Sequence, residues 1–228
     1  PGPRDAVVRV AACGICGSDL GYLRLGGVAG PTDSPMPIGH EFAGVVEAIG
    51  AEVSGVAPGD RVVVDPQAAE NRIGNGGTEG AFTPRLLVRN VPDGRCLIPI
   101  PDALPFELAA LAEPLGVGMQ AVNRSRAVPG EKAVVFGAVP IGLAAIATLA
   151  YRGVEDVIAI DLSDTRLAVA EQLGARASIT PTRDRTPPRL RHLHRTPPHM
   201  RAPPAGTATT FHTVLIRTSI CKLLYGRP

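Results

Sequence analysis

Short apolar runs separated by glycine and proline dominate the first hundred residues. Gly17 to Leu23 predicts a short helical turn, and the sequence Ala57-Pro58-Gly59-Asp60 predicts a turn between two strands. The apolar runs predict β-strands at 6–12, 42–49, 61–65, 85–88 and 96–98. Many short strands joined by such turns indicate a compact, mostly β domain.

The pattern changes in the second hundred residues. Pro105 to Ala112 predicts a helix, Lys132 to Phe136 a strand, Ile141 to Tyr151 a helix, and Val157 to Ile160 a second strand. The uncharged stretch from Ala133 to Ala150 is long enough to span a membrane, but Gly137, Pro140 and Gly142 break it, so no membrane segment is expected. The fold class is therefore mixed α/β, with a strand–turn–helix–strand unit of the kind that binds dinucleotides.

The turn of that unit reads Gly137-Ala138-Val139-Pro140-Ile141-Gly142. The dinucleotide pattern has glycine where this chain has Val139, because the middle glycine lets the backbone approach the pyrophosphate. A β-branched side chain is bulky and resists positive φ, so weakened cofactor binding is predicted. Asp161 ends the second strand, where an acid accepts from both ribose hydroxyls and favours NAD over NADP.

Composition changes abruptly near residue 176. Residues 177–228 hold nine of the 23 Lys and Arg but one of the 21 Asp and Glu, and residues 180–205 include seven prolines and six arginines. Neither a helix nor a central strand tolerates that density of proline, so a disordered tail is predicted over 180–228. We interpret the tail as out-of-frame or foreign sequence that truncates the dinucleotide fold.

Truncation would leave two parallel strands, with Ala177 to Ile179 as the start of a third. Because so small a sheet cannot cover both faces, Val134, Phe136, Ile158 and Ile160 are expected to expose apolar surface. The basic tail also raises the alternative of a non-specific nucleic-acid binder. Few aromatic side chains are present there to stack on bases, which makes nucleic acid an unlikely partner.

Four cysteines at irregular spacings do not predict a disulfide framework, and no signal peptide is evident, so a cytoplasmic location is expected. His40 is the only histidine before residue 190, and it stands beside Glu41 in a glycine-flanked bend. Zinc accepts imidazole, carboxylate and thiolate ligands, and Cys16 is the candidate thiolate. A His-Glu pair alone is more often a surface feature than a metal site, so the surrounding sequence is needed to distinguish the two.

Two spacings around these residues carry a family resemblance. Gly-His-Glu-x2-Gly-x5-Gly-x2-Val runs from Gly39 to Val53, and Cys-Gly-x-Cys-Gly-Ser-Asp ends at Asp19. Together they resemble the zinc-dependent alcohol dehydrogenases of the medium-chain dehydrogenase/reductase family, from about Val7 to Ala175. The resemblance implies a chaperonin-10-like catalytic domain over 1–120 and a partial Rossmann domain over 121–179, followed by the tail over 180–228.

The resemblance also implies roles for single residues. Cys16, His40 and Glu41 would hold one catalytic zinc, with Glu113 as a fourth group, as in the polyol and threonine dehydrogenase branches. Asp19 would accept a hydrogen bond from the zinc-bound imidazole, and Ser18 would pass the alcohol proton outward. From sequence alone, Ser18 is equally a helix N-cap, Glu113 an acid in a first helical turn, and Cys13 a small buried thiol.

Many relatives carry a second, structural zinc on four cysteines, but residues 66–95 contain none, so no structural zinc is expected and 67–80 is predicted as a loop. The leading hypothesis is a zinc-dependent oxidoreductase that transfers hydride from a secondary alcohol or polyol to NAD, bound through Gly137, Val139, Gly142 and Asp161. Because the nicotinamide half of the dinucleotide fold is missing, little or no activity is expected of this chain alone, and an inactive zinc-binding remnant is the alternative. Relatives are homo-oligomers, but truncation makes that state doubtful here.

Overall fold

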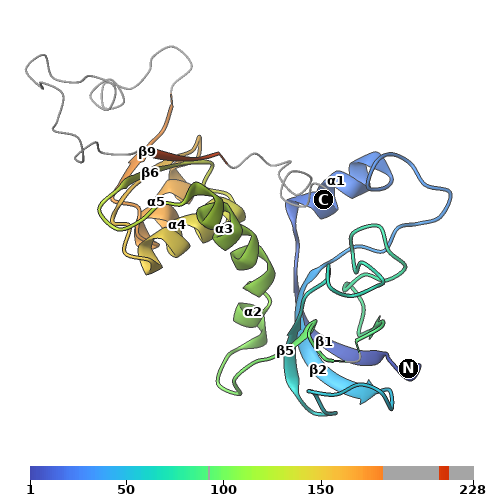
Figure 1. Ribbon diagram of the computed structural model, residues 1–228. Helices are drawn as coiled ribbons and strands as arrows, with labels where there is room; N and C mark the ends of the chain where they lie inside the picture. The colour runs from blue at the N-terminus through green and yellow to red at the C-terminus, as the bar shows by residue number, and fades with distance from the viewer. Residues whose placement is uncertain (92, 182–210, 216–228) are drawn as a thin grey trace, which may run out of the picture. The chain divides into compact units, whose positions relative to one another are not determined.

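The computed structural model describes residues 1–91, 93–181 and 211–215. The chain divides into two units, Pro1–Glu113 and Pro114–Pro228 (Figure 1). The division falls near the boundary expected at residue 120. Each unit has a hydrophobic core of its own, built around Phe42 and Leu86 in the first and around Ile146 and Leu149 in the second.

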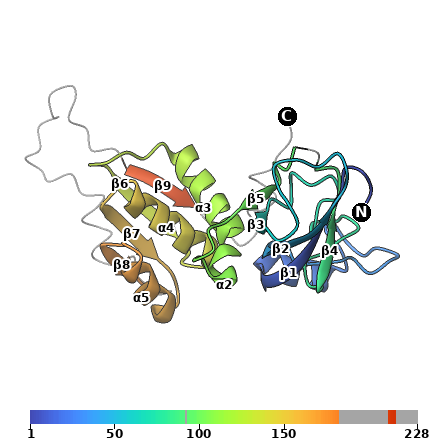
Figure 2. The ribbon, with the colours of Figure 1, turned by 90° about the horizontal axis from the view of Figure 1, so that it is seen from below.

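A five-stranded antiparallel sheet forms the first unit, in the order β4-β1-β2-β3-β5 (Figure 2). All five strands match runs that the apolar pattern predicts. Their bounds are β1 Ala6–Gly14, β2 Glu41–Ile49, β3 Arg61–Val64, β4 Arg85–Val88 and β5 Leu97–Pro99. The compact β domain expected from the short runs is thereby confirmed.

Strands β1 and β2 pair along most of their length, and glycine permits their close approach. A methyl group on Gly44 would lie 2.2 Å from the carbonyl oxygen of Arg9, so no larger residue fits there without moving β1. Their register places Gly14, the last residue of β1, opposite Glu41, the first of β2. The end of β1 therefore lies beside the start of β2, where the metal ligands were predicted.

Two short helices accompany this sheet, α1 Gly17–Leu25 and α2 Phe106–Ala109. Arg61 on β3 places its guanidinium 4.0 Å from the ring centre of Phe106 and donates to the carbonyl of Leu104. Residues 67–80 contain no helix or strand, as predicted. Nevertheless Ala69 and Ile73 from this loop are buried in the core of the sheet.

The second unit is a four-stranded parallel sheet in the order β8-β7-β6-β9, with helices packed on it (Figure 2). Its elements are α3 Ala112–Ser125, β6 Lys132–Phe136, α4 Pro140–Tyr151, β7 Asp156–Ile160, α5 Asp164–Gln172, β8 Ala177–Ile179 and β9 Phe211–Leu215. Among the described residues, no helix is long and apolar enough to cross a membrane.

Strand β9 comes from the segment that the sequence predicts to be disordered. It pairs in parallel with β6, on the edge that β7 does not occupy. Phenylalanine, threonine and valine favour strands, a local signal that the surrounding prolines and arginines concealed. Apart from 180, 181 and 211–215, the predicted tail lies outside the described residues, as do His192, His194 and His199.

The apolar side chains of the parallel strands are mostly covered. Val134, Ile158 and Ile160 are each no more than 9% exposed and cluster with Ile179 of β8. The expectation that they expose apolar surface is wrong, because β8 adds a further strand whose Ile179 packs with them. Of the four residues named, only Phe136 exposes apolar surface as expected, with an exposed fraction of 36%.

Candidate metal centre and cofactor turn

Cys16 occupies the N-cap position of α1, between the end of β1 and the helix. The carboxylate of Asp19, three residues on, accepts a hydrogen bond of 2.9 Å from the backbone N–H of Cys16. This return contact, with an acid in the first turn, is the arrangement that fixes a helix start. It also fixes the position from which the thiol of Cys16 projects.

His40 and Glu41 stand at the point where the chain enters β2. Gly39 before them has φ +91°, a conformation that other residues rarely adopt, so glycine makes the bend that brings His40 inward. His40 is 1% exposed and Glu41 7%. A methyl group on Gly14 would lie 2.5 Å from Oε2 of Glu41, so glycine at that position leaves room for the carboxylate.

These elements bring three potential ligands together. The ligand atoms of Cys16, His40 and Glu41 all lie within 4.8 Å of one another. Both ring nitrogens of His40 are buried, and neither has a hydrogen-bond partner of good geometry within the described residues. A buried imidazole nitrogen without a partner is costly, and a bound cation would satisfy it. The donor set of sulfur, nitrogen and oxygen fits zinc.

Asp19 connects both ligand-bearing segments. Besides Cys16, it accepts from the backbone N–H of Gly39 at 3.2 Å, and its Oδ1 lies 3.4 Å from Nδ1 of His40. Burial alone would raise the pKa of Asp19, but the contacts with His40, Cys16 and Gly39 lower it below its ordinary value. Asp19 is therefore an anion held beside Nδ1 of His40.

The charge balance of the site calls for a cation. Burial would lower the pKa of His40, yet Asp19, Cys16 and Glu113 raise it to about 10, since a positive charge among these groups is favoured. Burial raises the pKa of Glu41, although Cys16 and His40 oppose the shift. A divalent ion would take over the role of the imidazolium proton.

Among the described residues, Glu113 does not belong to the group whose ligand atoms lie within 4.8 Å of one another. Glu113 is the second residue of α3. The alternative that it is an acid in the first turn of a helix is therefore confirmed. Burial raises the pKa of Glu113 to about 7, with His40 lowering it and Glu41 raising it further. The charges of His40 and Glu41 thus act on Glu113 in opposite directions.

Ser18 and Cys13 complete the neighbourhood. The N-cap of α1 is Cys16, so the alternative that Ser18 is the N-cap is wrong. The Oγ of Ser18 is buried and has no hydrogen-bond partner within the described residues. Cys13 packs against the core of the sheet, and burial raises the pKa of its thiol to about 12. Such a thiol is a poor source of thiolate, which agrees with its exclusion from the predicted ligands.

The turn after β6 is as tight as the glycine pattern predicts. Gly137 has φ +95°, and a methyl group on Gly142 would lie 1.7 Å from the carbonyl oxygen of Gly137. Val139 is the N-cap of α4, with φ −75° and ψ 171°. The predicted conflict of Val139 with positive φ is therefore wrong, because its backbone is extended; the bulk of its side chain remains.

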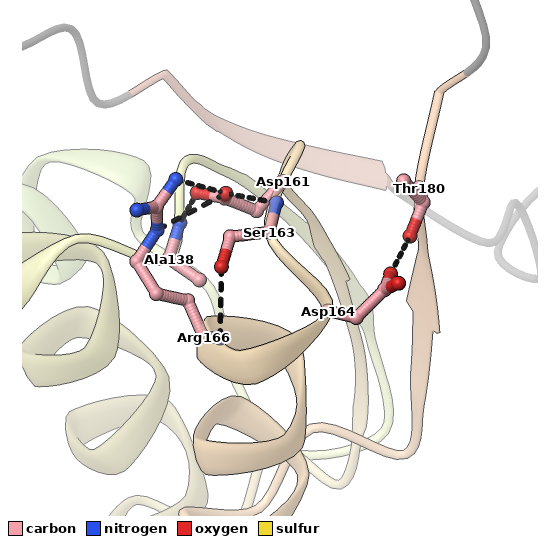
Figure 3. Close-up of polar contacts among 6 residues, drawn as sticks. All are labelled: Ala138, Asp161, Ser163, Asp164, Arg166 and Thr180. Atoms are coloured by element: carbon pink, nitrogen blue, oxygen red, sulfur yellow. Dashed lines mark hydrogen bonds and ion pairs between the residues drawn. The ribbon is translucent and has the colours of Figure 1, made fainter.

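Asp161, 7% exposed at the end of β7, closes this turn from the other side (Figure 3). Its carboxylate accepts from the backbone N–H groups of Ala138 at 2.7 Å and Ser163 at 2.8 Å. It also accepts from Nε and Nη2 of Arg166, at 3.1 and 2.6 Å. Burial would raise the pKa of Asp161, but Arg166 and the two N–H groups lower it.

Sequence reasoning missed Arg166. The signal available was an arginine five residues after the acid, in the first turn of the following helix, where its side chain reaches back to the strand end. In the same close-up the hydroxyl of Thr180 donates to Asp164 at 2.6 Å, which links the end of β8 to the start of α5 (Figure 3).

Comparison with known proteins shows which family the first unit resembles. Residues 2–102 match the family model described as the alcohol dehydrogenase GroES-like domain. These residues form a GroES-like domain of the alcohol dehydrogenases. The family resemblance, stated above from the spacing between Gly39 and Val53 and from the motif that ends at Asp19, is thereby confirmed.

Relatives extend the similarity beyond the GroES-like domain. The chain is 38% identical over 195 residues to (R,R)-butanediol dehydrogenase of Bacillus subtilis. The match covers 76% of this chain and 55% of that protein. It is also 34% identical over 189 residues to human sorbitol dehydrogenase, and that match covers 77% of this chain and 53% of the human protein. The chain spans about half the length of the curated relatives it matches.

Solved structures show the same relationship. A putative zinc-binding dehydrogenase from Sinorhizobium meliloti 1021, bound to NADP, superposes with a TM-score of 0.69 at 31% identity, covering 79% of this chain and 56% of that one. The superposition covers more of the chain than the GroES-like match does, so the likeness to this dehydrogenase continues into the second unit.

Proposed function

We propose that the protein is a zinc-dependent oxidoreductase that oxidises a secondary alcohol or polyol with NAD. The observation that carries the proposal is the convergence of Cys16, His40 and Glu41, whose ligand atoms lie within 4.8 Å around an unpartnered imidazole nitrogen. The relatives named for butanediol and sorbitol support this class of substrate.

In this proposal Cys16, His40 and Glu41 hold one zinc ion, and Glu113 is the candidate fourth ligand. Bound there, zinc would supply a Lewis acid for the oxygen of an alcohol, while NAD would supply the hydride acceptor. Asp19 keeps the ring of His40 in orientation through its 3.4 Å contact with Nδ1. No four-cysteine lobe is present in the sequence, so one metal ion per chain is proposed.

Ser18 is proposed to carry the proton. Oxidation of an alcohol to a ketone releases a hydride and a proton, and the proton needs a path to solvent. The Oγ of Ser18 is buried beside the N-cap of α1 and is free to accept one hydrogen and pass on another. Asp19, kept anionic by its contacts, would keep the ring of His40 in place beside the metal ion during that transfer.

The cofactor would bind at the turn between β6 and α4. Gly137 and Gly142 make the turn tight, and the N-terminus of α4 favours the negative charge of a pyrophosphate. Asp161 at the end of β7 supports NAD, because a carboxylate repels a 2′-phosphate. Arg166 beside it is the feature that would have to turn away for ribose hydroxyls to reach the carboxylate.

The test uses the purified full chain. We expect one zinc per chain by metal analysis, and slow reduction of the cofactor with 2,3-butanediol, sorbitol or threonine, faster with NAD than with NADP. A chain without zinc would contradict the proposal. Zinc without turnover would instead support the second candidate, a zinc-binding protein that is not an enzyme, which the branched side chain of Val139 in the cofactor turn favours.

A nucleic-acid role through the basic tail stays a prediction of the sequence alone, because residues 182–210 and 216–228 lie outside the described residues. Salt-dependent retention of the chain on DNA would test it.

A further inference from the structure

Residues 69–82, here called the 69–82 loop, lie against the bend that presents His40. The backbone N–H of Ala81 donates to the carbonyl of Gly39 at 2.8 Å, and that of Phe82 donates to the carbonyl of Ile38 at 3.4 Å. The two residues immediately before the histidine are therefore hydrogen-bonded to a loop more than forty positions later in the chain.

Glycines on both sides make this contact backbone to backbone. Gly74 has φ +66°, and a methyl group there would lie 2.2 Å from the carbonyl oxygen of Gly39. A methyl group on Gly80 would lie 2.4 Å from the carbonyl oxygen of Ile38, and one on Gly39 would lie 3.0 Å from the ring of Phe82. At Gly74 and Gly80, therefore, a side chain fits only if the bend or the loop moves.

The 69–82 loop is itself anchored. Ile73 is fully buried in the core, and the amide of Asn71 donates to the carbonyl of Leu87 at 2.7 Å while accepting from the N–H of Arg89 at 3.3 Å. The loop is thereby fixed to β4. On its other side, Asn75 Oδ1 accepts from the hydroxyl of Tyr22 on α1 at 3.2 Å.

We infer that the 69–82 loop is a positioning element that sets the metal affinity of the Cys16–His40–Glu41 site, and that Gly74 and Gly80 are its positioning residues. Gly39 is held on its N–H by Asp19 and on its carbonyl by Ala81, so the loop and α1 fix the bend from opposite ends. The inference rests on the proposed zinc site. Ligands displaced by about half an ångström bind metal less well, and supporting contacts typically contribute 10–100-fold to affinity.

The test compares single alanine variants of the full chain. Gly74→Ala and Gly80→Ala each place a methyl group against the backbone of the bend. Gly55→Ala is the matched control, since Gly55 has φ +80° but its methyl group would meet only the carbonyl oxygen of Asp93 at an ordinary 3.6 Å. Zinc affinity is measured by competition with a chelator, and ligand geometry by the absorption spectrum of the cobalt-substituted protein.

We expect both loop variants to bind zinc at least about tenfold more weakly, with an altered cobalt spectrum, while Gly55→Ala retains wild-type affinity. If Gly74→Ala or Gly80→Ala loses the circular-dichroism signal of the folded chain, the zinc affinity of Phe82→Ala is measured in its place. That variant removes a ring that is 46% exposed from Gly39 without a clash, and it should weaken zinc binding several-fold. Wild-type affinity in all folded loop variants would overturn this inference alone, whereas a wild-type chain that binds no zinc would overturn the proposed function with it.

Discussion

The Oδ1 atom of Asp19 lies 3.4 Å from Nδ1 of His40, and each side chain is only 1% exposed. The same carboxylate accepts from the N–H groups of Cys16 and Gly39. One anion thus ties the start of α1 to the bend before β2, the two segments that carry the proposed ligands. Metal-binding histidines depend on such a partner for their ring orientation.

Asp19→Asn should therefore weaken zinc binding without unfolding the first unit. The amide keeps the size of the carboxylate but loses its charge, and we expect about a 10–100-fold loss of affinity in chelator competition. Asp33→Asn, an exposed change in the loop between α1 and β2, is the control and should bind as the wild type. Equal affinities for the two variants would show that Asp19 does not orient the imidazole.

The two cysteines near α1 provide a matched pair. Cys16→Ala removes a proposed ligand, so the zinc content should fall from one per chain to about a tenth or less, because three protein ligands are the minimum of most catalytic sites. Cys13→Ala changes a thiol that packs against the core and has a pKa of about 12, so it should retain zinc. Metal analysis after gel filtration measures both, and loss of zinc from Cys13→Ala alone would reverse the assignment.

Val139 separates two explanations for a weak cofactor site. Because its φ is −75°, alanine and glycine are both compatible with the backbone, and the bulk of valine is the feature that differs. Val139→Ala should therefore tighten NAD binding in calorimetry nearly as much as Val139→Gly, by about tenfold. Val139 packs partly on the core, so both variants should lose about 1 kcal/mol of stability. Unchanged NAD affinity in both would mean that valine does not obstruct the pyrophosphate.

The sequence predicted the elements of both sites but not the contacts that hold them. Residue type singled out Cys16, His40 and Glu41 as candidates because zinc chemistry restricts its ligands, and the family resemblance chose Cys16 over Cys13. The support of Gly39 by Gly74 and Ala81 could not, since it depends on how closely two backbone segments approach across the fold. Strand β9 was missed for a related reason: its pairing with β6 is decided by an open sheet edge rather than by the composition around it.

Asp161 makes the stability of the second unit depend on pH. Its folded pKa lies below the unfolded value of about 3.9, so its contribution is complete above that value and is lost as the pH falls through the folded pKa. Asp161→Asn should lower the free energy of unfolding by about 1–3 kcal/mol at pH 7, because hydrogen bonds to a charged group are lost and the amide faces the donors of Arg166 and Ala138. The difference from the wild type should shrink below about pH 4. Denaturant unfolding between pH 3 and 7 measures it, with Asp164→Asn, whose contact is a single hydroxyl from Thr180, as the control. A difference that stays constant over this range would show that Asp161 is not held as an anion.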